Sequence, residues 1–112
     1  MRQALDDIER LLRAYSHTYE ANLAAIVAET YRRDPKDACQ QLKTDEWWEE
    51  RDAVCGIDLA LDGGFTPEAR KDGKQLREAL ITVFMTMLAY GEKNDRGQLI
   101  VAQLQKWLES NI

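Results

Sequence analysis

The segment GGFTPEAR marks the strongest structural boundary in the chain. Its two glycines permit a tight reversal of the backbone. Thr66 can cap a helix that Pro67 begins, because proline at the first helical position lacks only an N–H group that has no partner there. Apolar spacing then predicts a helix through Tyr90, about 36 Å long at 1.5 Å per residue. Gly73 lies inside this helix, where glycine is unfavourable, so we expect another backbone to approach it closely.

Four further segments carry helical signals. Apolar residues recur at i, i+3, i+4 and i+7 in residues 4–15 and again in residues 19–31. The poor helix formers of YSHT separate them, which favours two helices over one kinked helix. Residues 35–42 follow a capping Asp34, and a last helix follows the pair Asp95 and Gln98. The expected core is Leu5, Ile8, Leu12, Leu23, Ile26, Leu42, Leu80, Phe84, Met87, Leu104 and Leu108.

The middle of the chain is ambiguous. Thr44 can cap a helix whose inward face would hold Trp47 and Val54. Large apolar residues at 57, 59 and 61, however, alternate with Asp58, Ala60 and Asp62, which is the period of a strand. We expect a helix to about Cys55, followed by a helical or irregular tail. The whole pattern predicts an all-α fold: one domain, residues 1–112, built as a bundle of five or six mostly antiparallel helices with short loops.

The bulk composition is that of a folded domain with no export or membrane signal. The chain has 112 residues, of which 45% are apolar and 31% charged. No apolar run approaches the roughly 20 residues that span a bilayer, and carboxylates interrupt the N-terminal segment. We expect no membrane contact and a cytoplasmic protein, or one exported by a route without a sequence mark. Cys39 and Cys55 are expected to be small apolar core residues.

Negative charge is concentrated in one third of the chain. The net charge is −5 overall, whereas residues 34–64 contain nine acidic and three basic residues and carry −6. Nucleic-acid binding needs a basic face, so we expect no nucleic-acid partner. A basic protein surface is a plausible partner for such a segment.

The sequence lacks the residue patterns of common catalytic and metal sites. His17 is the single histidine, it lies in a polar turn, and no serine or cysteine has a context that indicates activation by it. Glutamates at 46, 49 and 50 have helical spacing, but without histidine they would form a weak site for a hard cation at best. There is no phosphate-binding or dinucleotide motif. We expect no enzymatic activity, no metal and no cofactor.

The stretch TDEWWEERDAV places adjacent tryptophans among five carboxylates and one arginine. On a helix, two adjacent side chains point about 100° apart. We therefore expect Trp47 to face inward and Trp48 to lie at the edge of the domain or to face solvent. An exposed aromatic ring inside a charged rim is typical of a protein-binding hot spot. The predicted partner-binding residues are Trp48, Glu46, Glu49, Glu50 and Asp52.

The chain resembles a family of short, uncharacterised bacterial all-helical proteins. The resemblance rests on the tryptophan pair, on the segment GIDLALDGGFTPEAR and on the helix end YGEKN, and it covers most of the chain. It implies a helical fold and carries no activity. Small acidic proteins of this kind include immunity proteins that block a basic toxin, which is an analogy at the level of a class.

These observations predict a small acidic interaction protein that binds a basic protein partner. An immunity or inhibitor protein that binds a toxin is its most concrete version. One alternative is a homo-oligomer, a dimer of unknown role in which the Trp48 surface pairs with itself and Arg51 offsets the repulsion. The other is a bundle that binds a small ligand in a cavity lined by Tyr15, Tyr19 and Met87.

Overall fold

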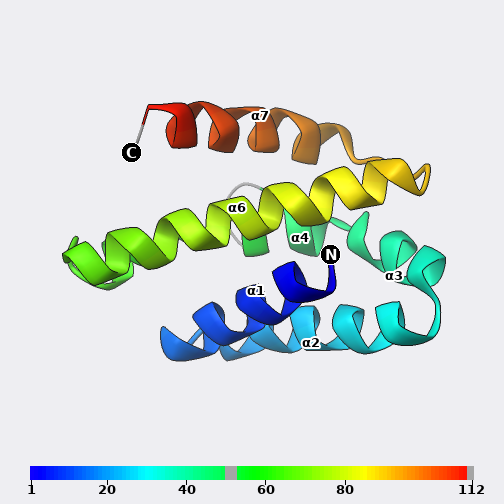
Figure 1. The fold of residues 1–112 in the computed structure, drawn as a ribbon, viewed down its shortest axis with the longest axis horizontal. Helices are drawn as coiled ribbons and strands as arrows, with labels where there is room; N and C mark the ends of the chain where they lie inside the picture. The colour runs from blue at the N-terminus through cyan, green and yellow to red at the C-terminus, as the bar shows by residue number, and fades with distance from the viewer. Residues whose placement is uncertain (50–52, 111–112) are drawn as a thin grey trace.

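The long helix that follows GGFTPEAR organises the molecule. The computed structural model describes residues 1–49 and 53–110. In it, α6 (Pro67–Ala89) runs along the whole length of the fold, with α1 (Arg2–Ala14) packed on one side and α7 (Asp95–Glu109) on the other (Figure 1). Thr66 accepts a hydrogen bond from the Ala69 N–H at 3.2 Å, as its capping role predicts. Gly91 has a φ of 83° directly after the helix, so the predicted end is confirmed.

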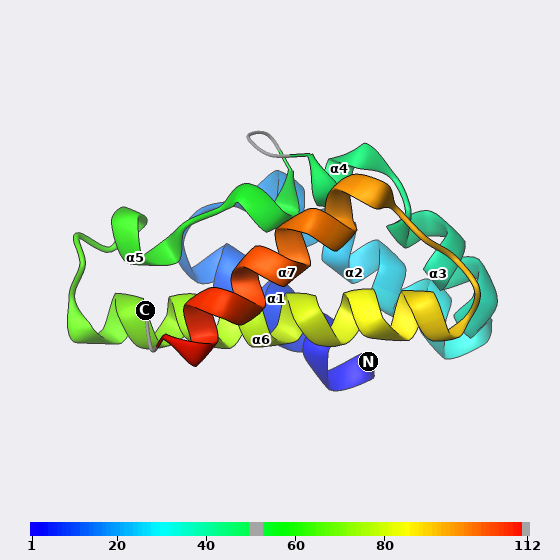
Figure 2. The same ribbon diagram turned by 90° about the horizontal axis from the view of Figure 1, so that it is seen from above.

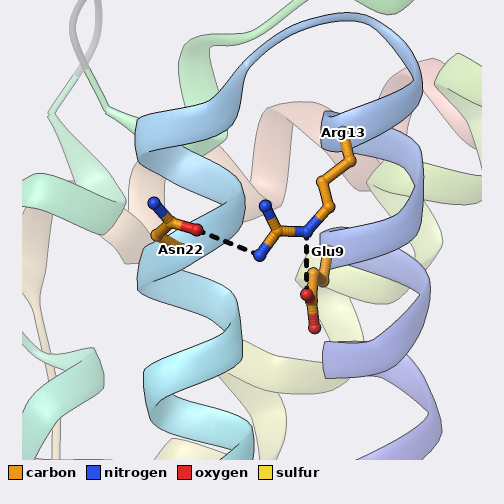
Figure 3. Close-up of polar contacts among 3 residues, drawn as sticks. All are labelled: Glu9, Arg13 and Asn22. Carbon is orange, nitrogen blue, oxygen red and sulfur yellow. Dashed lines mark hydrogen bonds and ion pairs between the residues drawn. The ribbon is translucent and has the colours of Figure 1, made fainter.

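Helices α1 and α2 (Thr18–Arg33) form an antiparallel pair below α6 (Figure 1). Arg13 joins them: its guanidinium donates to Glu9 on its own helix at 2.9 Å and to Asn22 on α2 at 3.0 Å (Figure 3). The two-helix prediction is therefore correct. His17 occupies the N-cap position of α2 and makes no side-chain cap bond, so neither Ser16 nor Thr18 caps this helix.

The remaining elements close the side of the molecule behind α6. Helix α3 (Pro35–Leu42) begins at the predicted Asp34 cap. The chain then forms α4 (Asp45–Trp48), the 3₁₀ turn η1 (Val54–Gly56) and α5 (Leu59–Asp62). Helix α7 crosses over α6 beside this segment (Figure 2). No strand occurs in the described residues, so the all-α prediction is confirmed.

The continuous helix expected up to Cys55 is wrong. Helix α4 is a single turn, because Glu49 already has extended backbone angles, with φ −79° and ψ 148°. Residues 57–61 are not a strand either, since α5 begins at Leu59 under a cap from Asp58. Gly73 behaves as predicted: a Cβ there would lie 3.6 Å from the backbone nitrogen of Ala60, so the α5 backbone passes beside it.

The hydrophobic core largely matches the predicted one. Leu23 and Leu108 are only partly buried, and Ile26 is 58% exposed, so its assignment to the core is wrong. Helix α2 instead buries a face of small residues that includes Ala21, Ala24 and Ala28. Both cysteines are buried free thiols, as predicted, and burial raises the pKa of Cys39. The confirmed core residues are Leu5, Ile8, Leu12, Leu42, Leu80, Phe84, Met87 and Leu104.

Candidate functional site

Trp48 of the predicted site lies inside the protein, as does Trp47, which was predicted to face inward. Trp47 is 1% exposed and Trp48 is 0% exposed, and their ring centroids are 6.3 Å apart. The Trp48 indole Nε1–H donates to the backbone oxygen of Leu42 at 2.6 Å. Its ring meets Phe84 of α6 edge to face, with 5.1 Å between centroids and 82° between planes. Trp48 therefore connects α3, α4 and α6 through one side chain.

The prediction that Trp48 faces solvent is wrong, because it assumed a helix that continues past residue 48. Helix α4 ends at Trp48, and α7 covers the ring that would otherwise be exposed. Close cover is possible because α7 has a glycine at this point: a Cβ on Gly97 would lie only 3.0 Å from two atoms of the Trp48 ring. A partner cannot use Trp48 as a surface anchor in this structure. For the same reason, a homodimer of this structure could not pair through the Trp48 ring.

Of the acidic residues around the tryptophans, the three that the structure describes are at the surface. Asp45, Glu46 and Glu49 are exposed, and Glu50 and Asp52 lie outside the described residues. Glu49 approaches Arg96 of α7, with 3.5 Å between carboxylate and guanidinium. The exposed edge of α4 is therefore flanked by a cation on its α7 side. Both side chains of this pair are more than half exposed, so it stabilises the fold weakly.

An aromatic residue on this acidic surface is Tyr19 of α2, which the sequence placed on the apolar stripe of residues 19–31. Tyr19 is 63% exposed, and its hydroxyl donates to Glu46 Oε2 at 2.8 Å. This hydrogen bond, followed by the charge of Glu46, raises the pKa of Tyr19 above its ordinary value, and Glu20 raises it further. We call the surface made by Tyr19, Asp45, Glu46 and Glu49 the acidic face.

One signal in the sequence could have placed Tyr19 outside. Residues 21, 24, 25 and 28 are alanines, and their spacing defines an alternative inward stripe of small side chains on α2. The stripe of larger side chains at Tyr19, Leu23 and Ile26 competes with it in the sequence. The structure buries Ala21, Ala24 and Ala28 and turns Tyr19 and Ile26 toward solvent.

A separate pocket lies between α6, α7 and the segment around η1. Its volume is about 470 Å³. None of Tyr15, Tyr19 and Met87 lines it, so this pocket is not the ligand cavity predicted from those residues. Tyr15 instead donates its hydroxyl to Asp72 at 2.8 Å, and Met87 is fully buried. The lining residues are Cys55, Gly56, Ile57, Asp58, Leu76, Arg77, Leu80, Leu99, Ile100, Gln103, Leu104 and Trp107.

Within residues 1–49 and 53–110, no three His, Cys, Asp or Glu side chains are grouped so that they could hold a metal ion. In the same part of the chain, no helix has the length and apolar character that a membrane crossing requires. His17, the single histidine, contacts Asp62 of α5, with 2.6 Å between Nε2 and the carboxylate oxygen.

Comparison of the chain with protein-family models, with curated proteins and with solved structures finds no match. The resemblance to bacterial helical proteins therefore stays a prediction.

Proposed function

We propose that this protein is a non-catalytic binding protein whose acidic face docks onto a basic protein. The observation that carries the proposal is the exposed ring of Tyr19 held beside Glu46 by a 2.8 Å hydrogen bond. Exposed tyrosines are enriched in protein interfaces because they offer a large, rigid apolar area with a polar tip. In this proposal Tyr19 takes the anchoring role that the sequence analysis gave to Trp48.

Charge supports a basic partner. Asp45 and Glu46 of α4 and Glu49 directly after it are exposed, and Arg96 offsets part of their charge. The surrounding third of the chain carries −6 by sequence. Such a surface accelerates encounter with a positively charged protein and repels negatively charged ones. An inhibitor or immunity protein that blocks a basic toxin is the most concrete version of this role.

The test compares capture of partners from a lysate of the native cells by immobilised wild-type protein and by two surface variants. Glu46→Lys reverses the charge beside Tyr19, and Tyr19→Ala removes the anchor. We expect a stoichiometric basic partner that Glu46→Lys loses and that Tyr19→Ala binds at least tenfold more weakly, as loss of a hot-spot aromatic predicts. Association of the purified pair should slow as salt is added, because exposed charges are screened.

Glu78→Lys is the matched control. Glu78 is an exposed glutamate of α6 that belongs neither to the acidic face nor to the pocket lining, and its substitution changes the net charge by the same amount. It should keep the partner. A partner that all variants retain equally would place binding on another surface, and an acidic partner would contradict the electrostatic basis of the proposal.

A further inference from the structure

The pocket between α6 and α7 is large enough to hold a small molecule. Its volume of about 470 Å³ lies within the range of about 300–1,000 Å³ that small-molecule sites occupy. It is built by α6, α7 and the segment from η1 to Asp58, whose course can be followed in Figure 2. It shares no residue with the acidic face, so a ligand in the pocket and a partner on that face would use separate contacts.

The buried part of the pocket lining is apolar. Leu76 and Leu80 of α6 and Leu104 of α7 are buried, and Ile57 and Ile100 are partly buried in the same lining. An apolar molecule that entered the pocket would remove its own surface and this lining from water, which favours binding. Each CH₂ group that enters should strengthen binding about threefold to fourfold.

Leu99 continues this apolar lining to the surface of α7. It lines the pocket, yet it is 76% exposed. A single exposed leucine needs no explanation, but this one adjoins a cavity that is apolar inside. A molecule bound in the pocket would cover Leu99 and would therefore gain apolar contact at the opening as well as within.

Among the described residues that line the pocket, one is acidic and one is basic, and both already have contacts within the protein. The Asp58 carboxylate accepts a hydrogen bond from the Leu61 N–H at 3.2 Å and caps α5. The Arg77 guanidinium carbon lies 5.1 Å from the centroid of the Trp107 ring. The two charges offset each other, so the lining favours neither anions nor cations. A charged ligand would have to disturb these contacts to gain a partner, and it would lose hydration on entering.

The lining also has a thiol and an amide, both uncharged. The Cys55 Sγ donates to the backbone oxygen of Glu49 at 3.4 Å, so the protein already uses this group. Gln103 of α7 is exposed, and its side-chain amide offers donors and an acceptor without a charge. The side of the pocket at Gln103 therefore suits a neutral polar group that remains in contact with water.

We propose that this pocket binds a small uncharged molecule with an apolar body and one neutral polar group, as in a medium-chain alcohol. The apolar body would lie on Leu76, Leu80 and Leu104, and the polar group would lie beside Gln103. The site is distinct from the acidic face, so this proposal and the proposed function fail or stand separately.

The test uses decanol, octanol and the two charged relatives decanoate and decylammonium, each below the concentration at which it aggregates. Titrations are followed by the backbone amide signals of the labelled protein. We expect decanol to shift signals mainly in residues 55–58 and 99–107. Octanol should bind about tenfold more weakly, because two CH₂ groups fewer enter the pocket. Both charged compounds should bind at least threefold more weakly than decanol, because a charged head that stays in water holds back at least one CH₂ group.

Two tryptophan substitutions on α7 separate pocket binding from general adhesion. Gln103 is exposed and lines the pocket, so Gln103→Trp should fill the space and abolish binding of decanol. Gln105 is also exposed and does not line the pocket, so Gln105→Trp should bind decanol as the wild type does. The proposal is overturned if decanol does not bind, if the shifts lie elsewhere, if either charged compound binds as tightly as decanol, or if both tryptophan variants behave alike.

Discussion

At the scale of single residues, two helical glycines have opposite surroundings. A Cβ on Gly97 would lie 2.7 Å from Phe84 Cε1 and 3.0 Å from the Trp48 ring, which is too close for any real contact. A Cβ on Gly73 would meet its nearest neighbour at 3.6 Å, an ordinary van der Waals distance. The same substitution should therefore have opposite effects at the two positions.

We predict that Gly97→Ala destabilises the protein by about 1–3 kcal/mol, because the added methyl group overpacks the Trp48–Phe84 contact. Gly73→Ala should stabilise it by about 0.5–1 kcal/mol, because alanine restricts the unfolded chain and favours helix. Urea unfolding of both variants measures the two changes. Equal effects of the same sign would show that α7 does not approach Trp48 as closely as the structure has it.

On the acidic face, the pKa of the Tyr19 phenol depends on its neighbour Glu46. Its hydrogen bond to Glu46 raises the pKa of Tyr19 above the ordinary value of 10.0. Because only the protonated phenol donates this bond, its contribution to stability is fully present below pH 10 and is lost as the pH rises through the raised native pKa. Glu46→Ala should lower the pKa of Tyr19 toward 10.0, as followed by the ring signals of labelled tyrosines.

Asp72→Ala is the internal control for this titration. The Tyr15 hydroxyl donates to Asp72, which raises the pKa of Tyr15 in the same way. Asp72→Ala should lower the pKa of Tyr15 and leave that of Tyr19 unchanged. If the two substitutions affected both tyrosines alike, a general field and not the individual hydrogen bonds would control these phenols.

At the scale of elements, Asn94 fixes the start of α7 through both polar atoms of its side-chain amide. Its Oδ1 accepts a hydrogen bond from the Gly97 N–H at 3.0 Å and so caps the helix. Its Nδ2 donates to the backbone oxygen of Lys43 at 2.8 Å, directly after α3. The sequence analysis expected Asp95 in the capping role, one residue away. Because an aspartate can cap but cannot donate, the side-chain amide explains why asparagine suits this position.

We predict that Asn94→Ala costs about 1–2 kcal/mol, because it removes the cap and the contact with Lys43 together. Asn94→Asp keeps the cap and should cost less than half as much. Thermal or urea unfolding distinguishes the two. A loss of the same size in both variants would assign the effect to the Lys43 contact alone.

The elements also show what could be read from the sequence and what could not. Helices with strong caps and clear spacing, such as α3 and α6, were predicted nearly to the residue. The orientation of α2 was not, because its inward face is built from alanines that let α1 approach, while its larger side chains point outward. When the apolar periodicity of a helix is judged from its large side chains, an inward face made of alanines is missed, because such a face works by letting two helix backbones approach closely.

The helix predicted from Thr44 to about Cys55 was wrong for a different reason. Its caps and charges indicated a helix start correctly at Thr44, but nothing local shows that the helix ends after one turn. The end depends on tertiary contacts: Trp48 bonds to Leu42 and packs on Phe84, which lies 36 residues further along the chain. The acidic surface could be predicted from composition, whereas the identity of its exposed aromatic ring depended on that same tertiary packing.

At the scale of the whole molecule, Trp48 is the point where the separate helices meet. Its indole contacts the end of α3 through Leu42, the C-terminal part of α6 through Phe84 and the first turn of α7 at Gly97. The α1–α2 pair reaches this centre through its packing against α6. Loosening any of these elements exposes the same ring, so the fold should lose its structure in one cooperative transition.

We predict that Trp48→Phe lowers the free energy of unfolding by about 2–4 kcal/mol. The smaller ring leaves a cavity and leaves the buried Leu42 carbonyl oxygen without its donor. Trp107→Phe is the matched control, since Trp107 is 38% exposed and loses mainly its contact with Arg77, worth about 0.5–1 kcal/mol. Urea unfolding of both variants, with the slope against denaturant compared to the wild type, makes the measurement. If Trp48→Phe cost no more than Trp107→Phe, the helices would have to be held together elsewhere. If it instead split the transition in two, α7 would be a separate unit that Trp48 joins to the remaining helices.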